Sequence, residues 1–185
     1  METSMIVAIV AVVILAALVV AWVVVRNKRT QDLKRQFGNE YHRALEKTGS
    51  RSRAEAELVS RTKRIERLEI RPLSAGDHDR FAERWRSTQS AFVDRPASSV
   101  SDAEKLVVEA MRARGYPVGD FDQRAADLSV DHPRFVENYR EAHQLALACE
   151  RGEASTENLR QAMVHYRALF EDLLEAGRPE PELSR

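Results

Sequence analysis

The apolar positions of the chain begin with one uninterrupted block. Every residue from Met5 to Val25 is apolar and uncharged. As an α-helix with a rise of 1.5 Å per residue, this run measures about 32 Å, which matches a hydrocarbon core of about 30 Å. In lipid a helix satisfies its own backbone, so the many β-branched residues do not argue against one. The pattern predicts a transmembrane helix over 5–25, preceded by a short external N-terminus over 1–4.

The alternative to an anchor is a cleaved signal peptide, and three features argue against it. The segment before the run carries Glu2 and no basic residue. The run exceeds the roughly 7–15 apolar residues of a signal peptide. Arg26-Asn27-Lys28-Arg29 follows it, where a cleavage site would need small residues. We therefore expect the segment to remain as an anchor.

Beyond residue 25 the apolar positions recur with the period of amphipathic helices, and no stretch alternates as a strand does. Glycines, prolines and N-cap residues divide this pattern into segments. The predicted helices cover 30–47, 52–71, 74–92, 94–114, 120–130, 131–152 and 155–177. The fold class is therefore all-α: a transmembrane helix over 5–25, a basic juxtamembrane helical stalk over 26–71, a small helical bundle over 72–177 and a disordered tail over 178–185.

Particular residues set the predicted helix boundaries. Ser52 and Glu55 form a capping box, and Asp94 with Pro96 reads as an N-cap and first turn. Pro133 is expected at the first position of the helix that Asp131 and His132 open. Further N-caps are predicted at Ser74, Asp120 and Ser155, and helix ends at Gly49, Gly115, Gly152 and Gly177.

An aromatic stripe marks the helix predicted over 74–92. Phe81, Trp85 and Phe92 fall on one side of it together with Thr88. Such a stripe is typical of a core face, and a partner-binding face is the alternative. The clearest amphipathic stripe belongs to the last helix and comprises Leu159, Ala162, Met163, Tyr166, Phe170, Leu173 and Leu174.

Charge orients the anchor. The chain has 29 basic and 29 acidic residues, but the basic ones are in excess over 26–69 and the acidic ones over 70–185. A basic cluster follows the apolar run directly, so the positive-inside rule places this side in the cytoplasm. The predicted lipid headgroup contacts are Arg26, Lys28, Arg29, Lys34 and Arg35; a topology signal alone is the alternative. Ala17 and Ala21 form a small-xxx-small pair through which two spans would dimerise.

No arrangement in the sequence amounts to an active site. The five histidines lie outside metal-binding spacings, and Cys149 is the only cysteine, so a disulfide within the chain is excluded. There is no nucleophile elbow and no glycine-rich phosphate loop. We predict no catalytic, cofactor-binding or metal-binding residue, no cofactor and no nucleic-acid partner. The sequence leaves enzyme activity open without favouring it.

Ionisable residues gather between two predicted turns, over 120–138. Asp120, Arg124, Asp131, His132 and Arg134 form a candidate partner surface there; a pH-sensitive contact through His132 is the other functional interpretation. The plain alternative is helix caps and surface salt bridges.

Three segments carry a resemblance: Arg114–Val118, Asp120–Pro133 and Ala154–Phe170. Together with the anchor and Phe37–Tyr41, they resemble a family of bacterial proteins described as uncharacterised membrane or secreted proteins. The resemblance implies a bacterial, membrane-anchored chain and transfers no functional residue.

The leading hypothesis is a membrane-tethered helical interaction module, an adaptor or scaffold on the cytoplasmic face of a bacterial plasma membrane. Its expected partners are the lipid bilayer and an unidentified protein, with a homodimer through the transmembrane helix as a further option. The alternatives are a small-ligand-binding protein or enzyme with a site around Asp120–Asn138, and a sensor whose span dimerises.

Overall fold

The computed structural model describes the backbone of residues 2–176 and the side chains of residues 14–176. Over these residues the chain is all-helical, as predicted, and contains no strand. The helices are α1 (Glu2–Phe37), α2 (Asn39–Thr48), α3 (Arg51–Ile65), α4 (Ala75–Ala91), α5 (Pro96–Arg114), α6 (Phe121–Asp131), α7 (Val136–Glu150) and α8 (Thr156–Glu175). The predicted tail over 178–185 and the helix end at Gly177 lie outside the described residues. Two compact units divide the chain, Met1–Leu58 and Val59–Arg185.

In the first unit, α1 continues from the apolar run through the basic cluster to Phe37, because neither glycine nor proline interrupts it. Gly38 then adopts a φ of 51°, in the left-handed region that other residues avoid, and α2 begins at Asn39. The single helix predicted over 30–47 is therefore wrong, since this glycine divides it. Gly49, also left-handed, ends α2 as predicted.

The amphipathic stripe of that segment nevertheless points inward. The end of α1, α2 and the start of α3 each contribute buried apolar residues to the first unit. These residues are Leu33, Phe37, Tyr41, Ala44, Ala54 and Leu58.

The described part of the apolar run is exposed. Residues 5–13 of the predicted transmembrane helix lie outside the described side chains. In the part of the chain that is described, no helix combines the length and the apolar character needed to cross a membrane.

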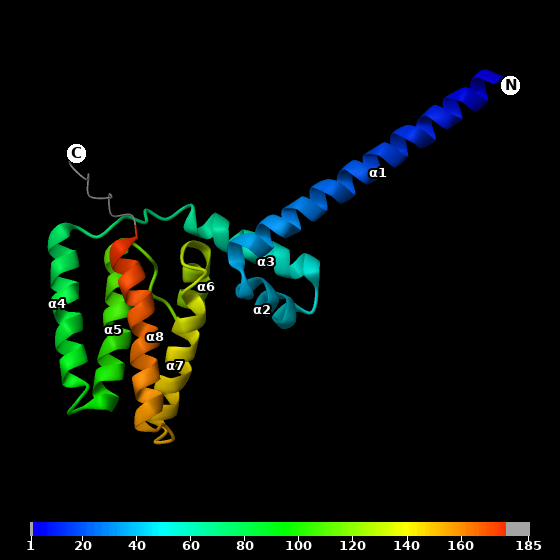
Figure 1. Ribbon diagram of the computed structural model, residues 1–185. Helices are drawn as coiled ribbons and strands as arrows, with labels where there is room; N and C mark the ends of the chain where they lie inside the picture. The colour runs from blue at the N-terminus through cyan, green and yellow to red at the C-terminus, as the bar shows by residue number, and fades with distance from the viewer. Residues whose placement is uncertain (1, 177–185) are drawn as a thin grey trace, which may run out of the picture. The chain divides into compact units, whose positions relative to one another are not determined.

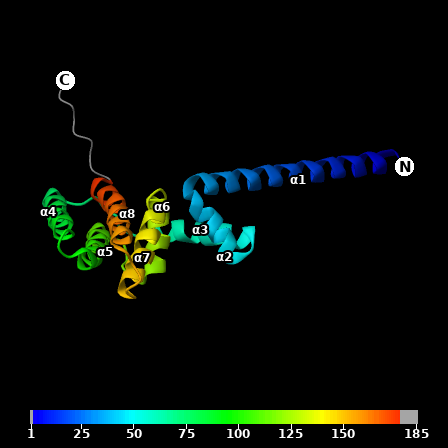
Figure 2. The same cartoon turned by 60° about the horizontal axis from the view of Figure 1, so that its bottom comes forward.

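The second unit is a helical bundle, in which α4, α5, α8 and α7 lie side by side (Figures 1 and 2). In Figure 1, α4 and α7 run downward, whereas α5 and α8 run upward. The helix α8 packs against both α5 and α7, and α4 packs mainly against α5.

The aromatic stripe of α4 belongs to the core of this bundle. Phe81 and Trp85 are buried, and Trp85 stacks on Phe170 of α8 with ring centroids 4.6 Å apart. Phe92 packs against the same core. The core interpretation of the stripe is confirmed, and the inward residues predicted for α8 are buried with it.

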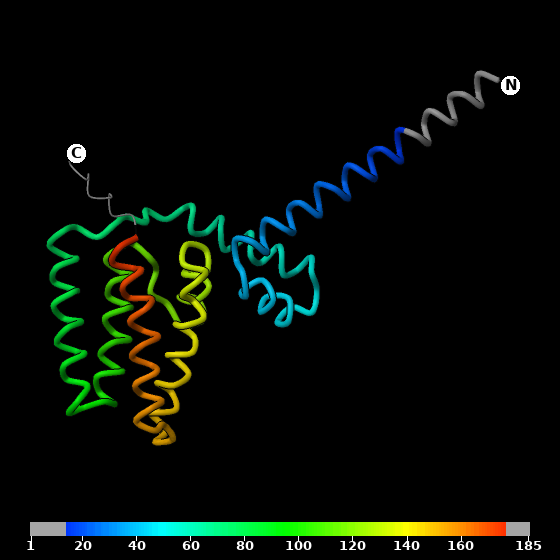
Figure 3. Tube along the Cα trace, viewed as in Figure 1, coloured from blue at the N-terminus to red at the C-terminus, as the bar shows by residue number. Residues whose placement is uncertain are grey.

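The chain between α3 and α4 crosses the end of the bundle (Figure 3). The backbone N–H of Arg71 donates to the carbonyl of Arg114 over 2.9 Å. Gly115 ends α5 with a φ of 99°, as predicted, and a Cβ atom there would lie 2.6 Å from the carbonyl oxygen of Glu69. Both the dihedral angle and the close approach therefore require glycine.

Three predicted N-caps are confirmed. The side chains of Ser74, Asp120 and Ser155 each accept a hydrogen bond from the backbone N–H three residues later. Each thereby satisfies a helix-terminal donor that has no partner within its own helix.

Four other boundaries differ from prediction. The helix predicted over 52–71 ends already at Ile65, and a turn follows it. Arg95, not Asp94, is the N-cap of α5, although Pro96 does stand in its first turn. The residues around Pro133 form a turn, and α7 begins only at Val136. The helix α3 begins at Arg51, before Ser52, and the Glu55 carboxylate binds side chains far along the chain instead of completing a capping box.

Candidate functional site

The predicted headgroup residues surround α1 where its apolar part ends. Arg26, Lys28, Arg29, Lys34 and Arg35 are all exposed. At 100° per residue they point in different directions around the helix axis and form a basic collar. The guanidinium of Arg26 lies 5.1 Å from the centre of the Trp22 ring. Contact of this collar with lipid headgroups stays a prediction.

The buried carboxylate of Glu55 binds side chains from α1, α2 and α3 in the first unit. Glu55 accepts hydrogen bonds from the hydroxyl of Thr30 over 2.7 Å, from Nε of Arg51 over 2.9 Å and from the hydroxyl of Tyr41 over 3.2 Å. Burial raises the pKa of Glu55, but these hydrogen bonds outweigh it and leave the pKa below its ordinary value. The carboxylate is therefore held in its charged form.

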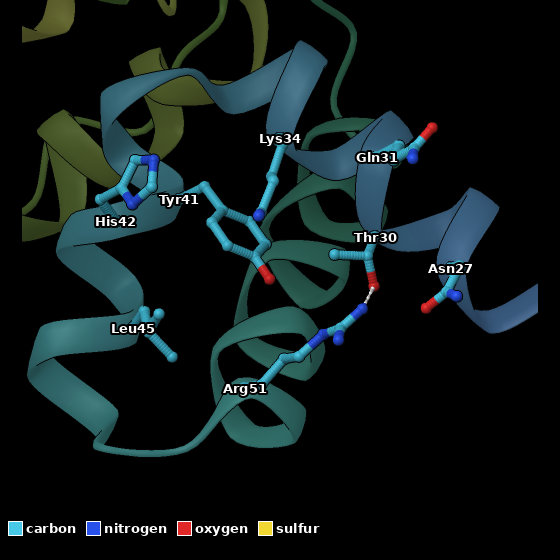
Figure 4. Close-up of a pocket in the computed structure, with 8 residues that line it drawn as sticks. All are labelled: Asn27, Thr30, Gln31, Lys34, Tyr41, His42, Leu45 and Arg51. Atoms are coloured by element: carbon cyan, nitrogen blue, oxygen red, sulfur yellow. Dashed lines mark hydrogen bonds between the residues drawn. The ribbon is translucent and has the colours of Figure 1, made fainter. Parts of the chain in front are cut away.

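A hollow of about 300 Å³ is lined in part by the three residues that hydrogen-bond Glu55, namely Thr30, Tyr41 and Arg51 (Figure 4). In Figure 4, Lys34 and Arg51 reach into it from opposite sides. The Nζ atom of Lys34 lies 5.4 Å from the centre of the Tyr41 ring, and Arg51 hydrogen-bonds Thr30. The lining residues are Asn27, Thr30, Gln31, Lys34, Tyr41, His42, Leu45 and Arg51.

The five residues of the candidate partner surface do not gather in one place. Asp120 caps the start of α6, whereas Asp131 and His132 lie at its other end. Arg134 is exposed in the turn that follows. Their role in partner binding stays a prediction, and only Asp131 and His132 share one cluster.

Arg124 joins α6 to its neighbours. Its Nε donates to the hydroxyl of Tyr139 over 2.8 Å, and its Nη1 donates to the carbonyl of Gly119 over 2.7 Å. Glu104 of α5 lies 3.5 Å from Arg124 and 3.2 Å from Nδ1 of His143. His143 also stacks on a phenylalanine of α6, so this network connects three helices inside the bundle.

His132 is buried, with only 4% of its surface exposed. Its Nδ1 contacts Oδ2 of Asp172 on α8, and its Nε2 lies 3.1 Å from Nη1 of Arg114. Because a guanidinium only donates, Nε2 is the acceptor in this pair, so the ring proton stands on Nδ1 and is donated to Asp172. The imidazole therefore links the C-terminal ends of α5 and α8.

Tyr116 completes this cluster. Its hydroxyl donates to Oδ2 of Asp131 over 2.6 Å and lies 3.2 Å from Nε2 of His132. Burial, and next the hydrogen bond to Asp131, raise the pKa of Tyr116 well above its ordinary value. The phenol therefore keeps its proton at alkaline pH and remains a hydrogen-bond donor. An Asp–His pair of this kind can orient a general base, but here Arg114 donates to the second nitrogen, and the cluster joins the end of α5 to α8.

Sequence reasoning did not identify the partners of Glu55 or those of His132. Arg114 is the last residue of the helix predicted over 94–114, and Asp172 lies 40 residues from His132 along the chain. Among the residues whose side chains are described, no group of three or more histidines, cysteines or carboxylates is placed to hold a metal ion.

Comparison with known proteins finds no matching family model, no matching curated protein and no matching solved structure. The resemblance to a bacterial membrane-protein family therefore stays a prediction.

Proposed function

We propose that the chain is a membrane-tethered helical interaction module. In this proposal, the apolar segment 5–25 anchors it in a bilayer, and its helical part is held at the cytoplasmic face. One observation carries the proposal: over residues 14–25, the part of the apolar run whose side chains are described, α1 is apolar on every side. Nine large apolar side chains between Ile14 and Val25 are exposed, by 41–67% of their surface.

A helix at the surface of a soluble domain is apolar along one stripe only, whereas one that is apolar all round is covered by protein or lipid. At 100° per residue the nine side chains point to all sides of α1. The segment 5–25 contributes further apolar residues, and each Val, Ile or Leu favours insertion by roughly 0.3–0.6 kcal/mol. Insertion is therefore favourable by several kcal/mol.

The basic collar supports both the anchor and its orientation. A ring of cations directly after an apolar helix is the arrangement expected at the cytoplasmic end of a membrane span. Trp22, in the last turn of the apolar segment, suits the interface between hydrocarbon and headgroups.

The protein contact that we propose for the bundle is a polar one. In the described part of the second unit, the large apolar side chains that are exposed are Val93 and Val164. These two do not form a broad apolar patch, and acidic residues exceed basic ones over 70–185. A partner that docks here would meet charged and hydrogen-bonding groups, which favour selective and reversible association.

Alkaline carbonate extraction of bacterial membranes tests the anchor. The full chain should stay in the pellet, and the double variant Leu15→Arg/Val19→Arg should move to the supernatant, because each arginine costs roughly 3 kcal/mol at the centre of a span. A wild-type chain recovered in the supernatant would overturn the proposal.

Orientation is tested in the same cells with a single exposed thiol. In a Cys149→Ser background, Ser101→Cys places one cysteine on the exposed surface of α5. A membrane-impermeant maleimide should label it only after spheroplasts are lysed. Labelling of intact spheroplasts would contradict the cytoplasmic assignment, while leaving the anchor itself in place.

A further inference from the structure

We propose that the hollow between the end of α1, α2 and the start of α3 binds the phosphate of an anionic phospholipid headgroup. This inference rests on the proposed membrane anchor. In place of a diffuse contact between the five cations of the collar and the lipid, we infer a single binding site in which Lys34 and Arg51 are the principal ligands.

The hollow lies at the depth of the headgroups when residue 25 marks the edge of the hydrocarbon. With a rise of 1.5 Å per residue, Asn27 and Thr30 stand roughly 3 and 8 Å beyond that edge. The headgroup layer is about 5–8 Å thick on each side of a bilayer. Lys34 stands about 14 Å beyond the edge, but helical side chains point back toward the N-terminus, so its ammonium returns to the same layer.

The charges in the hollow suit a phosphodiester. Lys34 contacts the face of the Tyr41 ring and has no carboxylate partner among the described residues. Arg51 has five N–H donors and uses Nε on Glu55 and Nη2 on Thr30. Two cations and one carboxylate leave a single net positive charge, which a phosphodiester anion would balance.

The remaining lining residues fit the other parts of a lipid headgroup. Asn27, Gln31 and His42 supply polar groups for the hydroxyls of a glycerol headgroup, and Leu45 supplies an apolar wall. The volume of about 300 Å³ lies at the small end of ligand pockets, which suits a headgroup better than a large metabolite.

A lysine outside the hollow separates this site from general attraction to anionic lipid. Lys28 is exposed, belongs to the same collar and does not line the hollow. If the collar acts only through its summed charge, Lys28→Gln and Lys34→Gln should weaken lipid binding equally, by about fivefold at most. If the hollow holds the phosphate, the two variants should differ.

The experiment uses the full chain in detergent micelles, titrated with phosphatidylglycerol and followed by native mass spectrometry. We expect the apparent Kd of the first bound lipid to rise at least tenfold in Lys34→Gln and less than twofold in Lys28→Gln. Circular dichroism should be the same for both variants, because both positions are exposed. Equal effects of the two substitutions would overturn the site.

Two further arms identify the source of the phosphate. Zwitterionic phosphatidylcholine should bind the wild-type chain more weakly than phosphatidylglycerol does; equal binding would contradict the charge argument. Inorganic phosphate at millimolar concentration should leave the bound lipid in place; its displacement would assign the hollow to a soluble phosphate and overturn the lipid assignment.

Failure of the anchor is read separately, from carbonate extraction. A chain that stays in the membrane pellet yet binds lipid alike with and without Lys34 refutes the headgroup site alone. A chain found in the supernatant refutes the anchor, and the headgroup site with it.

Discussion

Replacing His132 by alanine tests the cluster at the end of the bundle most directly. The substitution removes the imidazole that accepts from Arg114 and donates to Asp172. Arg114 is only 5% exposed, so its guanidinium cannot regain full hydration. Its remaining hydrogen bond, to the carbonyl of Arg71, is long at 3.4 Å, and the guanidinium also lies 5.6 Å from the centre of the Tyr116 ring.

The expected cost follows from these exposures. A hydrogen bond to a charged group contributes about 1.5–3 kcal/mol, and a buried donor that loses its partner bears the full desolvation penalty. The side chain of Asp172 is 28% exposed, so water compensates part of its loss. We therefore expect His132→Ala to lower the free energy of unfolding by about 3 kcal/mol. That is a large share of the roughly 5–15 kcal/mol of a whole domain.

Urea unfolding of the full chain in detergent measures this difference. Trp85 is stacked in the bundle core, so a Trp22→Phe background makes its fluorescence the sole tryptophan signal from the second unit. With a slope of about 2 kcal/mol per molar urea, the midpoint should fall by roughly 1.5 M.

The matched control is His165→Ala. Nε2 of His165 lies 3.2 Å from the Glu141 carboxylate at the partly exposed surface, where even a full ion pair contributes at most about 1 kcal/mol. If the free energies of unfolding of the two alanine variants differ by less than about 0.5 kcal/mol, the buried network does not contribute to stability. The assignment of His132 as a link between α5 and α8 is then refuted.

Three further predictions follow from the same structure. Gly115→Ala should lower the free energy of unfolding by at least about 3 kcal/mol, and Gly152→Ala by only about 1–2 kcal/mol. Both glycines have positive φ angles, but only a Cβ at Gly115 would meet a backbone oxygen. Similar losses for the two variants in urea unfolding would contradict the close approach at Gly115. The depressed pKa of Glu55 means that its stabilising contribution is present above the ordinary pKa of 4.5 and is lost as the pH falls through the lower folded-state pKa. The thermal midpoint should therefore fall more steeply on acidification in the wild type than in Glu55→Gln, and parallel curves would contradict this. Burial raises the pKa of all four tyrosines, so no tyrosinate absorbance should develop near pH 10 until the chain unfolds; early ionisation of any one would contradict its burial. They are Tyr41, Tyr116, Tyr139 and Tyr166.

The fold class could be predicted from the sequence because apolar periodicity survives in each helix. The stripes on α4 and α8 lie in the core as predicted, since a helix with one apolar face has few other ways to bury it. Boundaries were less secure. Gly38 interrupts an apolar stripe that continues across it, so periodicity alone could not show that the helix ends there.

The clusters of the candidate site could not be predicted, because their partners lie far apart in the sequence. Ser52 and Glu55 match the spacing of a capping box, but the Glu55 carboxylate turns to Thr30 and Tyr41, 25 and 14 residues away. A buried carboxylate needs several donors, and three converge on it from α1, α2 and α3. The local sequence pattern singled out Glu55 and His132 but did not predict the partners of either residue.

Ion pairs in the folded chain also determine which positive charges are available to a membrane. Counting charges over 26–69 treats every cation as free, but several have partners in the folded chain. Arg43 contacts Glu40 over 3.4 Å, and Arg51 contacts Glu55. In the second unit, Arg64 pairs with the fully buried Asp127 of α6.

The collar is different, because Lys28, Arg29, Lys34 and Arg35 are exposed and have no ion pair among the described residues. Unpaired cations retain their full attraction for a negatively charged surface, whereas a paired cation brings its own carboxylate with it. The positive charge that can act on lipid therefore concentrates in residues 26–35, within about 15 Å of the end of the apolar segment. This concentration, rather than the excess counted over the whole stalk, is the physical basis for placing the headgroup site at Lys34.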